Sequence, residues 1–173
     1  MRTLLFVYML LILFAVLTAA QNSSIYTSTK AGSCRTILAT SEGAGSYIGE
    51  CIGVGGYKVR LIEGDIRQTL DIVAPGKKRF ELNFWHIFSS FSSIGEKIEW
   101  RVKQGIPFAL IVRYNVSDPA DPGRSTSYLM VSRIGRQLSC VTDVVDPGPR
   151  QNEIARQLAD AANGKPCKIS KQA

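Results

Sequence analysis

Alternation of apolar and polar residues predicts a series of short β-strands over most of the chain. In residues 97–103, Ile98, Trp100 and Val102 occupy alternate positions and charged residues fill the positions between them. Successive side chains of a strand point to opposite faces, so this pattern predicts a strand with one face on a core. The same reasoning predicts further strands at residues 46–52, 57–63, 66–73, 108–114, 127–134 and 137–146.

Turn residues separate these predicted strands. Gly105-Ile106-Pro107 interrupts the chain before residues 108–114, where Phe108, Leu110, Val112 and Tyr114 are expected to share a face. Residues 118–123 combine Asp, Pro and Gly, which favour turns because Pro fixes φ and Gly accepts positive φ. Neighbouring predicted strands are therefore expected to pair as antiparallel hairpins.

The apolar pattern changes period after residue 150. Residues 151–163 place Ile154, Ala155, Leu158, Ala161 and Ala162 on one helical face. Asn163-Gly164 is expected to form a left-handed C-terminal cap, and Pro166 to prevent continuation. A second helix is considered within residues 80–93. Together the patterns predict an α+β fold: a single twisted, mainly antiparallel sheet of six to seven strands with the C-terminal helix packed on it.

The N-terminus has the features of a signal peptide. Arg2 precedes fourteen apolar residues, 4–17, and the small residues Thr18-Ala19-Ala20 follow. A membrane-spanning helix needs about 20 apolar residues, so we predict cleavage after Ala20 and no stable membrane insertion afterwards. The predicted organisation is a signal peptide at 1–20, a flexible segment at 21–30, one α+β domain at 31–169 and a tail at 170–173.

The mature chain keeps four cysteines: Cys34, Cys51, Cys140 and Cys167. An even number of cysteines in an exported protein indicates disulfides, and four cysteines allow three pairings. We favour Cys34–Cys51 and Cys140–Cys167 because each cysteine is then joined to its nearest neighbour in sequence. A metal site is not expected, because no C-x-x-C pair is present and His86 is the one histidine of the chain.

The chain is basic, with 21 Lys and Arg against 14 Asp and Glu. Loss of Arg2 with the signal peptide leaves 20 against 14, a formal charge of +6. Seven basic residues lie opposite the bulkiest residues of their predicted strands, and neighbouring strands are expected to bring them together as a cationic sheet face. They are Lys58, Arg60, Lys97, Arg101, Lys103, Arg113 and Arg133. A merely solvated sheet face is the alternative interpretation.

Few residues indicate catalysis. Gly53-Val54-Gly55-Gly56 lacks the lysine of a phosphate-binding loop and is better explained as a hairpin turn. Asp65 and Arg67 are interpreted as a structural ion pair. His86, the best catalytic candidate, lies among apolar residues and is typical of a partly buried structural histidine. No cofactor is expected.

Several segments resemble a group of small exported proteobacterial proteins of unknown function. The resemblance rests on residues 51–57, 64–67 and 105–114, and on Cys140 followed by residues 152–156, and it spans most of the mature chain. It implies an envelope or secreted location in a Gram-negative bacterium and a shared fold, without an assigned activity. Members of the group commonly carry a histidine after the cysteine equivalent to Cys140. This chain has Val141 there, which weakens any histidine-based chemistry at this position.

The sequence therefore predicts a non-enzymatic periplasmic or secreted protein that binds an anionic envelope component or a protein partner through its basic sheet face. Nucleic acid is not an expected partner, because Trp100 and Tyr114 are predicted to face away from the basic residues and cannot stack on bases. The alternatives are a hydrolase of envelope material with His86 in its site, or a small secreted inhibitor of an enzyme.

Overall fold

The computed structural model describes residues 21–168 except residues 31 and 122, so the predicted signal peptide and the 170–173 tail lie outside the described residues. The described chain contains strands, one α-helix and two short 3-10 helices. In chain order these are β1 (Ser23–Ser28), β2 (Cys34–Thr40), β3 (Ser46–Ile52), β4 (Lys58–Gly64), β5 (Arg67–Val73), β6 (Arg79–Glu81), η1 (Phe84–His86), β7 (Ser92–Lys103), β8 (Ile106–Ser117), β9 (Ser125–Arg133), β10 (Cys140–Val145), α2 (Gln151–Asp160) and η2 (Ala162–Gly164).

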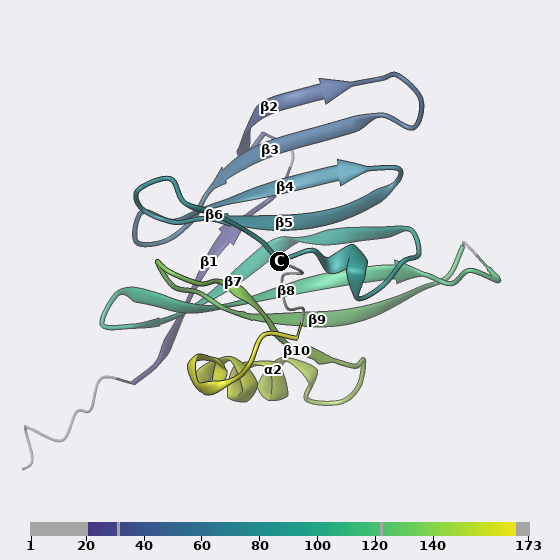
Figure 1. Ribbon diagram of the computed structural model, residues 1–173. Helices are drawn as coiled ribbons and strands as arrows, with labels where there is room; N and C mark the ends of the chain where they lie inside the picture. The colour runs from purple at the N-terminus through teal and green to yellow at the C-terminus, as the bar shows by residue number, and fades with distance from the viewer. Residues whose placement is uncertain (1–20, 31, 122, 169–173) are drawn as a thin grey trace, which may run out of the picture.

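All ten strands belong to one hydrogen-bonded sheet of order β10-β9-β8-β7-β5-β4-β3-β2, with β1 paired to β7 and β6 paired to β5. The β5–β7 pairing is parallel and consists of the single residue pair Arg67↔Ser92, whereas the other pairings are antiparallel. The prediction of six to seven antiparallel strands is therefore wrong in number, and the sheet is mixed. Figure 1 shows β2–β5 as an upper layer and β7–β10 as a lower layer, with α2 beneath the lower one.

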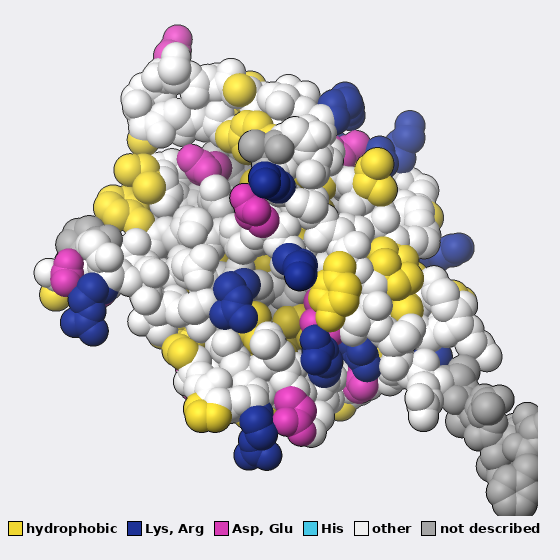
Figure 2. All heavy atoms as spheres, turned by 180° about the vertical axis from the view of Figure 1, so that it is seen from behind, with side chains coloured by type: hydrophobic (Ala, Val, Ile, Leu, Met, Phe, Trp, Pro, Cys, Tyr) yellow, Lys and Arg dark blue, Asp and Glu magenta, His cyan; other side chains and the backbone are white. Residues whose placement is uncertain are grey.

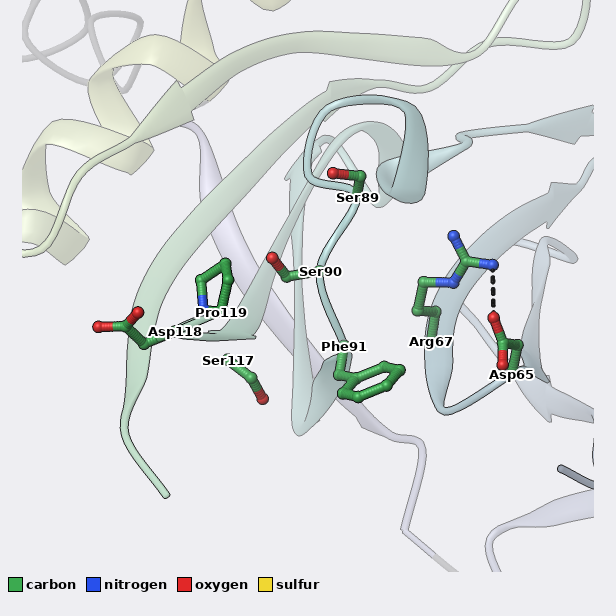
Figure 3. Close-up of a pocket in the computed structure, with 8 residues that line it drawn as sticks. All are labelled: Asp65, Arg67, Ser89, Ser90, Phe91, Ser117, Asp118 and Pro119. Carbon is green, nitrogen blue, oxygen red and sulfur yellow. Dashed lines mark hydrogen bonds and ion pairs between the residues drawn. The ribbon is translucent and has the colours of Figure 1, made fainter. Parts of the chain in front are cut away.

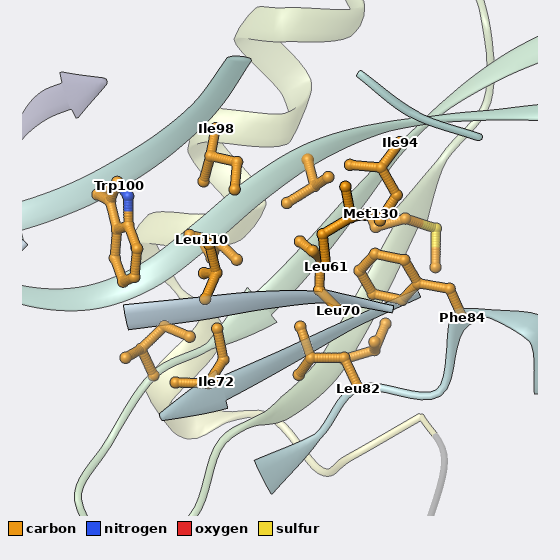
Figure 4. Packing of buried hydrophobic residues seen from close by; sticks show 14 of the residues in the cluster. Leu61, Leu70, Ile72, Leu82, Phe84, Ile94, Ile98, Trp100, Leu110 and Met130 are labelled. Atoms are coloured by element: carbon orange, nitrogen blue, oxygen red, sulfur yellow. The ribbon is translucent and has the colours of Figure 1, made fainter. Parts of the chain in front are cut away.

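The main hydrophobic core fills the space between these two layers. Figure 4 shows Leu61, Leu70 and Ile72 from β4 and β5 facing side chains of β7, β8 and β9. Trp100 is fully buried there, and its ring nitrogen donates a hydrogen bond to Thr27 of β1 at 2.8 Å. The predicted core positions of residues 97–103 are thus confirmed.

A smaller core lies on the other side of the lower layer, under α2. Ala109 and Ile111 of β8 pack with Val131 of β9 against Ala155 and Ala159 of the helix. Because β8 contributes Leu110, Val112 and Tyr114 to the main core and Ala109 and Ile111 to this one, it is buried on both faces. The predicted packing of the C-terminal helix on the sheet is confirmed.

Three strands were missed in the sequence because their side chains are mostly polar or exposed. β2 has almost no buried position, β6 has three residues, and β1 lies in the segment predicted to be flexible, residues 21–30. β1 instead pairs with β7 over its whole length, from Ser23↔Val102 to Ser28↔Lys97. Residues 23–28 therefore form a strand because their backbone pairs with β7, and not because they bury an apolar face.

Three local predictions also differ from the structure. Residues 80–93 contain β6 and the three-residue η1 rather than an α-helix. Phe108 packs with the smaller core instead of sharing a face with Leu110. The β7–β8 register shifts between Arg101 and Val102, so Phe108 has no opposing residue on β7 and its side chain points to the other face of the sheet. Gly164 has no positive φ, and the helix ends by tightening into η2.

Both predicted disulfides are confirmed. Cys34–Cys51 joins directly opposed residues of β2 and β3, and Cys140–Cys167 ties β10 to the segment after η2. Loop closure entropy assigns each bridge about 3 kcal/mol of stabilisation. Among the described residues, no helix is long and apolar enough to cross a membrane.

Candidate functional site

The fold divides the seven predicted basic residues between two surfaces. Lys58 and Arg60 lie on the outer face of the upper layer, whereas the other five lie on β7, β8 and β9. On the lower layer, α2 covers the face to which the basic side chains point. Figure 2 shows one face of the molecule, on which basic side chains are separated by acidic and apolar ones and form no continuous positive surface.

Three of the five arginines and lysines on the lower layer hold the C-terminal segment. Arg101 binds both carboxylate oxygens of Asp160 in α2, at 2.8 and 2.9 Å. Arg113 contacts Gln151 of α2 at 3.4 Å, and Arg133 donates to the Lys165 carbonyl at 3.3 Å. Lys97 and Lys103 remain exposed. Alternation along a strand identified the face correctly, but it could not reveal that the helix covers it.

A row of charged side chains crosses the outer face of the upper layer. The strand registers oppose Arg35 to Glu50, Glu50 to Arg60, Arg60 to Asp71, and Asp71 to Glu81. These residues alternate with core positions of their strands, so their side chains point away from the main core. Opposite charges directly across a sheet attract, so the first three pairs favour the pairing of β2 to β5. The last pair, Asp71 and Glu81, joins two like charges and opposes the pairing of β5 to β6.

One end of this row forms a concave site of about 440 Å³, which we name the basic pocket. Its charged lining consists of Arg35, Lys58, Arg60, Lys77 and the single acid Glu50, and the turn at Pro75–Gly76 closes one side. Four cations against one anion give the lining a net charge of +3. A positively charged concave surface attracts anions more strongly than a flat one does.

Glu50 orders the cations of the basic pocket. Its side chain is 8% exposed and accepts contacts from Lys58 at 2.7 Å, Arg60 at 3.2 Å and Arg35 at 3.4 Å. The hydrogen bond from Lys58, together with those from Arg60 and Arg35, overcomes burial and lowers the pKa of Glu50 to about 2. Arg60 uses its Nε for Glu50, and its two terminal nitrogens have no hydrogen-bond partner among the described residues. They are free to bind an oxyanion.

Asp71, the next acid along the row, is buried without a full set of partners. Its Oδ2 lacks a hydrogen bond among the described residues and lies 3.6 Å from Nε of Arg79. Burial raises the pKa of Asp71 to about 6, and the attraction of Arg79 only partly opposes this. At neutral pH the chain therefore carries an unfavourable buried carboxylate beside the basic pocket.

We expect Asp71→Asn to raise the free energy of unfolding by about 2 to 3 kcal/mol at neutral pH, because the pKa of Asp71 is raised from 3.8 to about 6 and one pKa unit corresponds to about 1.4 kcal/mol. The folded-state pKa lies above the unfolded one, so the stability of the unsubstituted protein falls as pH rises from about 4 through about 6. Urea denaturation across this range should give a flatter profile for Asp71→Asn. Glu42→Gln, which removes an exposed acid from the turn between β2 and β3, is the control. An equal gain for Asp71→Asn at about pH 4 and about pH 7 would contradict this account.

The remaining candidates lie outside the basic pocket. His86 is exposed at the end of η1, so the prediction that it is partly buried is wrong. It lines neither the basic pocket nor the pocket at Asp65 and Arg67. Asp65 and Arg67 form the expected ion pair at 2.9 Å. Residues 53–56 form the β3–β4 turn, where Gly55 and Gly56 have positive φ. In the part of the chain that the structure describes, no group of His, Cys, Asp and Glu side chains has the arrangement of a metal site.

Sequence reasoning missed Arg35, Glu50 and Lys77 as parts of the site. The first two could have been found from the correctly predicted Cys34–Cys51 bridge. If these cysteines oppose each other in antiparallel strands, the next pair in the register is Arg35 opposite Glu50. Lys77 lies in the β5–β6 turn at a φ of 71°, and no strand pattern predicts its position.

Comparison with known proteins adds no assignment: no protein-family model, no curated protein and no solved structure gives a significant match to the chain. The function must therefore be argued from the site itself.

Proposed function

We propose that the mature chain is an exported, non-enzymatic binding protein that holds an anionic group of an envelope component in the basic pocket. The observation that carries the proposal is the cluster of Arg35, Lys58, Arg60 and Lys77 around one buried acid. Glu50 holds the guanidinium and ammonium groups in place before a ligand arrives, so little side-chain order remains to be lost on binding. Two disulfides are in keeping with an oxidising, exported location.

The proposal narrows the cationic face predicted from the sequence. Three of the predicted residues hold the C-terminal segment and are left out of the proposed site: Arg101, Arg113 and Arg133. The site keeps Lys58 and Arg60 and gains Arg35 and Lys77. The ligand is expected to present a phosphate or carboxylate to the terminal nitrogens of Arg60 and the ammonium groups of the two lysines. Such contacts are charge-assisted and weaken when salt screens them.

The test uses the oxidised mature protein and immobilised lipopolysaccharide, an anionic glycolipid, with neutral dextran as the blank. We expect binding at about 50 mM salt and its loss at about 500 mM. The double variant Lys58→Gln/Lys77→Gln should weaken binding about tenfold or more, a loss of roughly 1.4 kcal/mol. It keeps Arg35 and Arg60 on Glu50, so the fold is retained.

The matched control is Lys97→Gln/Lys103→Gln, which removes the same net charge from exposed positions of β7. It should bind as the unsubstituted protein does. Equal weakening by both double variants would show that net charge alone drives association, and it would refute a role for the basic pocket.

A further inference from the structure

A second pocket lies where the two layers of the sheet meet. It has a volume of about 340 Å³ and is formed by the β4–β5 turn, the loop that leads into β7, and the end of β8. We name it the seam pocket. Its polar and aromatic lining includes Asp65, Arg67, Ser89, Ser90, Phe91 and Ser117. The volume falls within the range of small-molecule sites.

Backbone contacts fix the three segments of the seam pocket relative to one another. The Ser92 amide donates to the Ile66 carbonyl at 3.1 Å, and the Ser117 amide donates to the Phe91 carbonyl at 2.9 Å. Below the pocket, the Ser92 and Tyr114 hydroxyls are 2.6 Å apart in a buried hydrogen bond. The pocket is therefore built on ordered strand ends rather than on a free loop.

The side chains of the seam pocket combine three kinds of polar group around an aromatic ring. Arg67 only donates hydrogen bonds, the Asp65 carboxylate only accepts them, and serine hydroxyls do both. Among the described residues, the hydroxyls of Ser89, Ser90 and Ser117 make no hydrogen bond to the protein, so they are free for a ligand. Phe91 is 46% exposed and contributes its ring to the pocket instead of the main core.

The ligand that matches this lining has closely spaced groups that both donate and accept, together with an apolar face. Figure 3 shows the Phe91 ring between the Asp65–Arg67 ion pair on one side and Ser117 on the other. Asp118 adds a second carboxylate to the lining, although it points away from Phe91 in Figure 3 and accepts a hydrogen bond from the Ala120 amide at 2.9 Å. The lining thus holds two acids and one base and does not favour an anion. Ring hydroxyls and an apolar ring face are the properties of a neutral sugar.

The β4–β5 turn at the seam pocket has two residues between the paired strands, and a type I′ hairpin turn of this length requires positive φ at both. Asp65 and Ile66 have φ values of 54° and 57°, a left-handed conformation that a β-branched residue such as isoleucine rarely adopts. Ile66 gains no burial in return, because its side chain is exposed. The turn places Asp65 beside Arg67, at 2.9 Å.

From these observations we propose that the seam pocket binds a neutral sugar ring, which stacks on Phe91 and exchanges hydrogen bonds with Arg67, Asp65 and the serine hydroxyls. This site is separate from the basic pocket and does not depend on the function proposed for it. The serines and the aspartate supply no catalytic step in this proposal, which concerns binding alone.

The test is a titration of the isotope-labelled, oxidised mature protein, followed by amide chemical shifts. The probes are the methyl glycosides of glucose, galactose, mannose and N-acetylglucosamine, each raised to about 50 mM because single sugar rings bind weakly. At least one of them should give saturable shifts at residues 65–67, 89–91 and 117. Glucuronate, the charged analogue, should bind more weakly than the neutral glycosides.

Phe91→Ala should weaken the affinity for that glycoside about tenfold or more. Ile106→Ala, which also removes an exposed apolar side chain, should leave the affinity unchanged, as should Lys58→Gln/Lys77→Gln in the basic pocket. Absence of saturable shifts with all four glycosides would overturn the proposal. Unchanged binding by a folded Phe91→Ala protein, or tighter binding of glucuronate, would overturn it as well.

Discussion

Replacement of Trp100 by alanine should lower the free energy of unfolding by about 4 kcal/mol, the range observed for loss of a large buried aromatic side chain. Trp100 is fully buried between the two layers, lies near Tyr57 with ring centroids 6.4 Å apart, and hydrogen-bonds to Thr27. Alanine would leave a cavity in the middle of the main core and remove the contact with β1. Urea denaturation of the oxidised protein, followed by far-ultraviolet circular dichroism, measures the change.

Trp85→Ala is the matched control for this substitution. Trp85 is only half-buried, so its loss should cost about 1 kcal/mol. Trp100→Phe should fall between the two, because it keeps an aromatic ring but loses volume and the hydrogen bond to Thr27. Similar losses for the two alanine variants would contradict the assignment of Trp100 to the centre of the core.

Replacement of Arg101 by alanine should lower the free energy of unfolding by about 3 kcal/mol. The Arg101 side chain is 9% exposed and joins Asp160 through two hydrogen bonds and Ser24 through a third of 2.6 Å. Removal of one member of a buried ion pair leaves the other charge without compensation, which typically costs 3–5 kcal/mol. The lower end applies here, because Asp160 retains some contact with water.

The neighbouring acid strengthens this expectation. Burial tends to raise the pKa of Glu99, but hydrogen bonds from Arg156 and Ser24 outweigh it and hold the pKa below its usual value. Glu99 therefore stays ionised near Arg101. Loss of Arg101 removes the partner of Asp160 and one of the positive charges near Glu99, which keeps its ion pair with Arg156 at 2.7 Å. Arg35→Ala serves as the control: its side chain is 74% exposed, so urea denaturation should show a loss of less than about 1 kcal/mol. Equal losses for Arg101→Ala and Arg35→Ala would refute a structural role for Arg101.

Sequence reasoning succeeded where one side of a strand faces the main core. Residues 46–52 coincide with β3, and Ile98, Trp100 and Val102 occupy the predicted core face of β7. The disulfide pairing was also predicted correctly, because the cysteines nearest in sequence lie in segments that are neighbours in the fold. These features depend on local periodicity and short-range contacts.

Prediction failed where tertiary contacts decide the outcome. β2 has exposed side chains on both faces, so no alternation marks it, and its order depends on pairing with β3 and on the bridge at Cys34. Arg101 sits at a position that alternation assigns to solvent, and only the docking of α2 buries it. The basic pocket likewise combines residues of four separate segments, and their convergence is a property of the strand registers.

The pairing of β1 with β7 has a consequence for the order of folding. Thr27 and Trp100, which join the two strands, are separated by 73 residues. Closing so long a loop is entropically costly, whereas the consecutive hairpins β3–β4–β5 and β7–β8–β9 close over short distances. During synthesis β1 emerges long before its partner exists and must wait, unpaired, until residue 102 is available. We therefore expect the strand nearest the amino terminus to be among the last parts of the sheet to be completed.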